Sequence, residues 1–176
     1  MRLLVALAAL AASVLPGGVW AEVTQASSQG FVVREEALVA APPAAVWQVL
    51  VTPSRYWNPE HTWFGDSAAL VMDLDAACFC ERSASGGQQA EHARIVVASP
   101  GELLRLRGSL GPLQAEALTG TLSISLASES GGTRVIWEYV VGGYTRFPLD
   151  QVTSAVDAVM AEQLSRLAEA TLRRPE

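Results

Sequence analysis

The clearest signal for the fold lies in the stretch Val39-Ala40-Ala41-Pro42-Pro43-Ala44-Ala45-Val46-Trp47-Gln48-Val49-Leu50. The stretch continues a segment, Phe31–Ala40, that predicts a β-strand. Proline is favoured in the first turn of a helix, so Pro42-Pro43 predicts a short helix directly after this strand. The apolar residues of that helix share one stripe, and Thr52-Pro53 ends it.

Downstream of this helix the pattern changes to alternation. An aromatic-rich loop, Arg55–Phe64, comes first. Six segments with alternating apolar residues then predict strands. They are Ala68–Asp75, Ala77–Arg82, Glu91–Ala98, Glu102–Arg107, Ala117–Ser128 and Thr133–Gly142.

The last segment, Pro148–Leu172, predicts one long amphipathic helix. Its apolar stripe includes Met160 and lies near Gln163, whereas Asp157 and Glu162 are expected on other faces. Together the elements predict an α+β domain. A curved antiparallel sheet of about seven strands would wrap around the long C-terminal helix and leave room for a cavity between them.

This order of elements, with the Pro-Pro and Val46-Trp47 opening and Arg55-Tyr56-Trp57, resembles the SRPBCC superfamily, which includes START lipid-transfer domains, birch-pollen-allergen-like proteins and polyketide cyclases. The resemblance covers about residues 31–172. A closer similarity is to an exported bacterial subgroup of mostly uncharacterised proteins. The motifs shared with it are Cys78-Phe79-Cys80-Glu81, Glu91-His92, Leu110-Gly111-Pro112-Leu113-Gln114 and Val141-Gly142-Gly143-Tyr144. The resemblance implies a helix-grip fold with a tunnel for an apolar or amphipathic small molecule.

The N-terminus has the layout of a cleaved signal peptide over residues 1–21. Arg2 precedes an apolar run of about 13 residues, which is too short to span a bilayer. Val19-Trp20-Ala21 matches a small-x-small cleavage site, so cleavage is expected after Ala21. We therefore expect a periplasmic or secreted protein without a membrane span after cleavage, with a flexible leader at residues 22–30 and a single domain at residues 31–172.

The composition limits the classes of function. The formal net charge is −6 and the chain has no basic run, which argues against nucleic acid as a partner. Lysine is absent, so Schiff-base and lysine general-base chemistry are excluded. No nucleophile elbow, phosphate-binding loop, zinc-protease motif or dinucleotide fingerprint occurs, and no cofactor is expected. The oligomeric state is left open.

Cys78 and Cys80 are the only cysteines. Residues i and i+2 of an extended strand lie about 6.5–7 Å apart, at or beyond the limit for an unstrained disulfide. One alternative is a buried pair that lines the inner face as small hydrophobic residues, with Phe79 and Glu81 outside. The others are a disulfide, which export favours, and a metal site.

The position of His92 depends on the register of the hairpin around Gly86-Gly87. If His92 lies opposite Cys80, its imidazole and the two thiolates would be three candidate metal ligands, and His61 would be a possible fourth ligand. Opposite Glu81, it would form an ordinary cross-strand charge pair. A shift of one residue decides between these outcomes.

Three functions remain as hypotheses. The leading one is binding of an apolar or amphipathic small molecule, with the candidate ligand-binding residues Trp57, Trp63, Phe64, Cys78, Cys80, Met160 and Gln163. The second is a cyclase- or dehydratase-like enzyme with His61, Glu81 and His92 as acid/base candidates. The third is a redox or metal-handling protein that uses Cys78 and Cys80.

Overall fold

A computed structural model describes residues 20–173. The signal-peptide prediction falls almost entirely outside these residues. The strands are β1 (Trp20–Ser27), β2 (Gly30–Val39), β3 (Leu70–Asp73), β4 (Cys78–Arg82), β5 (Gln89–Ser99), β6 (Leu103–Arg107), β7 (Ala117–Glu129) and β8 (Gly132–Tyr144). The α-helices are α1 (Pro43–Leu50) and α2 (Asp150–Leu172). Short 3-10 helices are η1 (Pro53–Arg55), η2 (Pro59–His61), η3 (Ser67–Ala69) and η4 (Gly111–Ala115).

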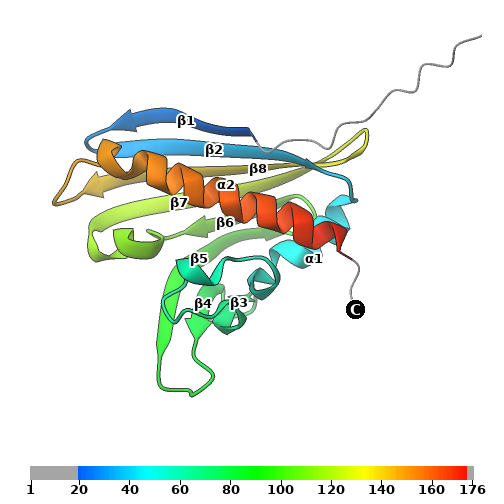
Figure 1. The fold of residues 1–176 in the computed structure, drawn as a ribbon, viewed down its shortest axis with the longest axis horizontal. Helices are drawn as coiled ribbons and strands as arrows, with labels where there is room; N and C mark the ends of the chain where they lie inside the picture. Colours follow the sequence, from blue (N-terminus) through cyan, green and yellow to red (C-terminus); the bar gives the residue numbers. More distant parts are fainter. Residues whose placement is uncertain (1–19, 174–176) are drawn as a thin grey trace, which may run out of the picture.

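All strands form one antiparallel sheet in the order β1-β2-β8-β7-β6-β5-β4-β3. The long helix α2 lies across one face of this curved sheet, and α1 packs near the C-terminal end of α2 (Figure 1). This is the α+β helix-grip arrangement that the sequence predicts. The sheet has eight strands instead of about seven.

The additional strand is β1, at the place where a flexible leader was expected. Residues 22–30 do not form a leader, because Trp20–Ser27 pairs antiparallel with β2. The side chains of Glu22–Gln29 are exposed, so this edge strand lacks the alternating apolar residues that would predict it. The expected cleavage after Ala21 falls within β1.

The core lies between the sheet and α2. Inward-facing rows from β2, β7 and β8 meet the apolar stripe of α2, as the alternation predicts. The largest buried side chains include Trp137 and Tyr139 from β8 and Leu164 and Leu167 from α2. None of the helices among residues 20–173 is long and apolar enough to cross a membrane.

Two acidic residues depart from the expected pattern. Glu35 occupies an inward position on β2 and is fully buried. Asp157 was expected on an outer face of the last helix, but its Oδ1 atom is buried and interacts with the Glu35 carboxyl group. The interface between sheet and helix therefore contains a pair of carboxyl groups that the helical pattern did not reveal.

Candidate ligand cavity

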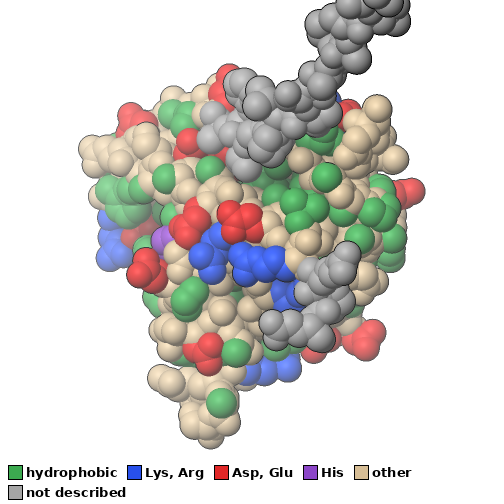
Figure 2. Space-filling view, turned by 45° about the vertical axis from the view of Figure 1, so that its right-hand side comes forward, with side chains coloured by type: hydrophobic (Ala, Val, Ile, Leu, Met, Phe, Trp, Pro, Cys, Tyr) green, Lys and Arg blue, Asp and Glu red, His purple; other side chains and the backbone are tan. Residues whose placement is uncertain are grey.

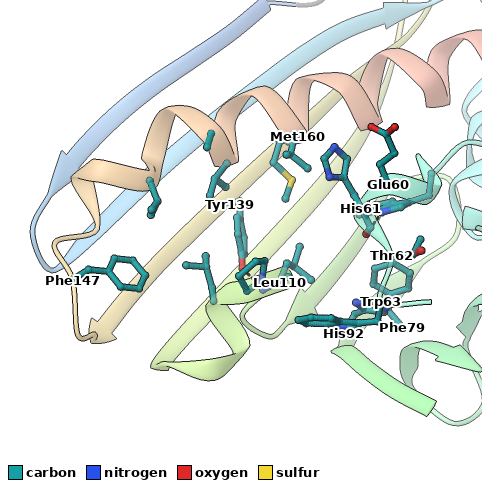
Figure 3. Close-up of a pocket in the computed structure, with 18 residues that line it drawn as sticks. Glu60, His61, Thr62, Trp63, Phe79, His92, Leu110, Tyr139, Phe147 and Met160 are labelled. Atoms are coloured by element: carbon teal, nitrogen blue, oxygen red, sulfur yellow. Dashed lines mark hydrogen bonds between the residues drawn. The ribbon is translucent and has the colours of Figure 1, made fainter. Parts of the chain in front are cut away.

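A cavity of about 530 Å³ opens between α2, the strands below it and two connecting segments. One wall comes from α2, through Val152, Ala155, Val156, Val159 and Met160. The others come from residues 110–113 around η4, from the aromatic loop and from side chains on β4, β5 and β8. Figure 3 shows Phe147 at one end and His61, Trp63 and His92 at the other, with Tyr139 and Met160 between them. Such a volume lies within the range of small-molecule sites.

The last helix holds the aromatic loop in place. Gln163 is fully buried, and its Oε1 atom accepts a hydrogen bond from the backbone N–H of Asn58 at 2.9 Å. Glu162 accepts one from the Asn58 side chain at 2.6 Å, and Arg166 Nε donates to the carbonyl oxygen of Tyr56 at 2.6 Å. These contacts set the position of Trp57 and His61 on the cavity wall.

A second anchor for the loop is Glu81 on β4, which is fully buried. Its two oxygen atoms accept hydrogen bonds from the backbone N–H groups of Trp63, at 2.9 Å, and Phe64, at 2.7 Å. His92 Nε2 lies 3.0 Å from the Oε2 atom of the same carboxyl group. Glu81 thus ties the loop to β5 through buried hydrogen bonds, which are costly to leave unmade.

A β-bulge places His92. Phe79 pairs with Ala93 and Cys80 pairs with Glu91, so His92 is the additional residue and lies directly opposite neither Cys80 nor Glu81. A bulge turns two successive side chains to the same face, and both His92 and Ala93 are buried. The expected alternation fails here, and the bulge brings the imidazole onto the cavity wall.

The His92 ring is held by the Phe79 ring and by its Nε2 contact with Glu81. The Phe79 ring lies 5.0 Å away between centroids, and the Trp57 ring lies 5.3 Å from the Phe79 ring. Burial lowers the pKa of His92 below its ordinary value, and the hydrogen bond to Glu81 opposes this only in part. The imidazole is therefore neutral near pH 7. Glu81 and His92 form a buried hydrogen-bonded pair, not the ordinary cross-strand charge pair of the second alternative.

His61 makes a similar contact nearer the surface. Its Nε2 atom lies 3.1 Å from Glu162 Oε2, and its side chain is 32% exposed to solvent. Both histidines thus lie on the cavity wall with a carboxylate at Nε2.

The candidate ligand-binding residues divide into two groups. Trp57, Trp63 and Met160 line the cavity. Phe64, Cys78, Cys80 and Gln163 do not. For the first group, a role in binding a ligand remains a prediction. For Gln163 the structure shows a different role, as an anchor of the loop.

The two cysteines were expected inside with Phe79 and Glu81 outside, and the structure reverses this. Phe79 lines the cavity and Glu81 is fully buried on the same side. Cys78 and Cys80 project to the opposite face of β4 and are joined by a disulfide. Their Cα atoms are 5.5 Å apart, which is shorter than in an extended strand and within the range for a disulfide.

In this arrangement the two cysteines are not available as ligands for the metal site that was one of the alternatives. Disulfide sulfur atoms are not thiolates, the form in which cysteine binds metals. Among the residues that the structure describes, no group of three or more His, Cys, Asp or Glu side chains could hold a metal ion.

Sequence reasoning missed several residues of the wall. Leu110–Leu113 and Phe147 also line the cavity. Tyr139 stands on the wall with its hydroxyl group fixed, since it donates to the Gly108 carbonyl at 3.1 Å and accepts from the Leu110 N–H at 2.8 Å. A signal was available in the Leu110–Gln114 motif, but nothing in its composition predicts which face it covers.

Comparison with known proteins identifies the family to which this chain belongs. The sequence profile of a family described as polyketide cyclase / dehydrase and lipid transport matches residues 31–172. The chain belongs to this family. It is thereby a member of the SRPBCC superfamily, in agreement with the helix-grip fold. No curated protein matches the sequence.

Solved structures of this fold are similar over most of their length. Protein CV1439 from Chromobacterium violaceum has a TM-score of 0.56 at 17% identity, over 81% of this chain and 98% of its own. An uncharacterised protein from Rhizobium leguminosarum has a TM-score of 0.58 at 15% identity, over 89% and 99%. CalU16 from Micromonospora echinospora has a TM-score of 0.52 at 14% identity, over 91% and 85%. At these identities the likeness extends to the fold alone.

Proposed function

We propose that this member of the family is an exported protein that binds an apolar or amphipathic small molecule in the cavity between its sheet and α2. The observation that carries the proposal is the cavity itself. Its volume of about 530 Å³ suits a small guest, and its walls are mostly apolar and aromatic. The description of the family, with lipid transport in it, agrees with such a function.

Export is supported by two independent features. The first is the apolar N-terminal run that ends in Val19-Trp20-Ala21. The second is the disulfide between Cys78 and Cys80, since disulfides form and persist mainly in oxidising compartments. A periplasmic or secreted location accounts for both.

The surface fits a small-molecule partner better than a nucleic acid. On the face shown in Figure 2, acidic side chains lie beside the basic ones, and the basic side chains form no continuous surface on that face. The net charge of −6 would repel a polyanion.

A titration with the neutral fluorescent probe N-phenyl-1-naphthylamine tests the binding function. We expect saturable binding to one site, and we expect Val156→Trp to weaken it strongly or abolish it, because Val156 lines the cavity and the indole would obstruct it. Val96→Trp makes the same substitution on the exposed face of β5 and should leave binding unchanged. Binding that Val156→Trp leaves unweakened in a folded protein would contradict the proposed site.

The acid/base enzyme is the second candidate, and the Glu81–His92 pair favours it. A neutral imidazole held by a buried carboxylate on a cavity wall has the form of a general base. The enzyme requires that the bound molecule change chemically, whereas the binding protein requires only that it be held. A molecule released from the protein with an altered covalent structure would favour the enzyme.

A further inference from the structure

The polar end of the cavity presents two imidazole rings, each with a carboxylate at Nε2. We propose that the guest is a neutral molecule with a hydroxyl group, and that its O–H donates a hydrogen bond to Nδ1 of His92, with Nδ1 of His61 as a second acceptor. This inference rests on the proposed binding function and names the chemical class of its ligand.

The hydrogen bonds around Glu81 determine the tautomer of His92. Backbone N–H groups can only donate, so the contacts from Trp63 and Phe64 make Glu81 an acceptor through both oxygens. The His92 Nε2 atom near the same carboxylate must then carry the hydrogen. In the neutral ring Nδ1 is left with a lone pair, so it accepts hydrogen bonds and does not donate them.

Nδ1 of His92 is open to the cavity. It makes no hydrogen bond to any residue of the described chain, and it is not among the fully buried side-chain atoms that lack a partner. It therefore reaches accessible space. The space beside this otherwise buried ring is the cavity.

His61 repeats the arrangement at the mouth. Its carboxylate partner, Glu162, also accepts a hydrogen bond from Asn58 Nδ2, so it too acts as an acceptor. With the hydrogen on Nε2, His61 offers Nδ1 as an acceptor. Figure 3 shows His61 and His92 at the same end, opposite Phe147.

The charges around the cavity disfavour an ionic head group. No arginine lines the described cavity and the chain has no lysine, so a carboxylate or phosphate has no fixed cation to pair with. Binding of an ammonium group is disfavoured as well. Glu81 and Glu162 already accept hydrogen bonds from protein donors, and Glu60 is exposed at the rim. A neutral donor avoids both desolvation penalties.

The donors on the wall are mostly engaged as well. Tyr139 O–H donates to the Gly108 carbonyl, and Trp57 Nε1 donates to the His61 carbonyl. Trp63 is half exposed at the rim. The inner wall therefore offers acceptors and little else that is polar. A hydroxyl group would meet the histidines, and an apolar body would extend past Tyr139 and Met160 towards Phe147.

Isothermal titration calorimetry with three matched naphthalenes tests the proposal. They are 2-naphthol, 2-methoxynaphthalene, which lacks the donor, and 2-naphthoate, which is anionic. One hydrogen bond predicts that the naphthol binds about threefold to tenfold more tightly than the ether at neutral pH. The naphthoate should bind most weakly. Equal affinities for naphthol and ether, or tighter binding of the naphthoate, would overturn the hydroxyl proposal.

Substitutions locate the acceptor. His92→Phe keeps a ring of similar shape and should reduce the preference for naphthol over the ether to less than about twofold. His61→Phe provides a second variant whose partner, Glu162, remains hydrated, and it should lower the preference in part. A full preference in both folded variants would contradict the assignment to the imidazoles.

Two results distinguish a failure of the hydroxyl proposal from a failure of the binding function. If all three naphthalenes fail to bind while N-phenyl-1-naphthylamine still binds in a manner sensitive to Val156→Trp, only the hydroxyl proposal is overturned. If that probe also fails to bind, the binding function itself is contradicted.

Discussion

Glu35 lies between Val33 and Ala37 on the inward row of β2, where every neighbour in that row is apolar. Neither of its oxygens has a conventional donor, and the same holds for Oδ1 of Asp157. Two carboxyl groups can form a hydrogen bond only if one carries a proton. Burial, the hydrogen bond with Asp157 and the charge of Asp157 raise the pKa of Glu35 from 4.5 to about 8.

This pair makes the stability depend on pH. Between about pH 5 and pH 8 the folded protein keeps a proton that the unfolded chain releases, so the free energy of unfolding falls as pH rises. The slope from one proton is at most about 1.4 kcal/mol per pH unit. Glu35→Gln removes the titration and lets the amide donate to Asp157. The variant should therefore gain stability over the wild type as pH rises towards 8, and the two should converge near pH 4.

Urea unfolding at several pH values measures this difference. Glu138→Gln is the matched control, because Glu138 lies on the exposed face of β8 and should show no such trend. A difference between Glu35→Gln and wild type that stays constant from about pH 5 to about pH 8 would contradict the shared proton.

At the level of elements, the β4–β5 hairpin combines a disulfide on one face with cavity residues on the other. The Cys78–Cys80 disulfide flanks Phe79, and the bulge opposite the Phe79–Cys80 step supplies His92. Because the disulfide closes only a very short loop, the chain-entropy account gives it about 1–2 kcal/mol of stabilisation.

Reduction of the disulfide should therefore have a modest cost. We expect no free thiol in the denatured protein before reduction. After reduction, the free energy of unfolding should fall by about 1–2 kcal/mol. The reductant should have no effect on a Cys78→Ser/Cys80→Ser variant. Two thiols that titrate before reduction, in protein purified from an oxidising compartment, would contradict the disulfide.

The hairpin also shows where sequence patterns stop being informative. Alternation correctly separated Cys78 and Cys80 from Phe79 and Glu81, but it did not reveal which pair faces inward. The inserted position of His92 depends on the pairing of two strands, and no pattern within either strand encodes it. By contrast, Leu122, Ile124 and Leu126 on β7 alternate cleanly and were predicted, because one face of that strand is buried.

At the scale of the whole molecule, the order of elements was predictable because the segments are long and strongly periodic. Strand β1 was missed because its exposed residues do not alternate between apolar and polar, and Asp157 because a helical stripe does not show a polar residue at its margin. In the candidate site, Trp57, Trp63 and Met160 were placed from their positions in the aromatic loop and on the last helix. The wall formed by Tyr139 and residues 110–113 depends on tertiary packing, which the sequence pattern does not report.

The central claim is that the cavity holds a small molecule in the protein's own environment. Native mass spectrometry of protein purified from its host, followed by solvent extraction, tests this most directly. The account predicts a complex with one added mass that organic solvent releases, absent from the Val156→Trp variant and retained in the Val96→Trp variant. An unliganded mass for the wild type, in preparations where known lipid-binding proteins keep their ligands, would contradict it.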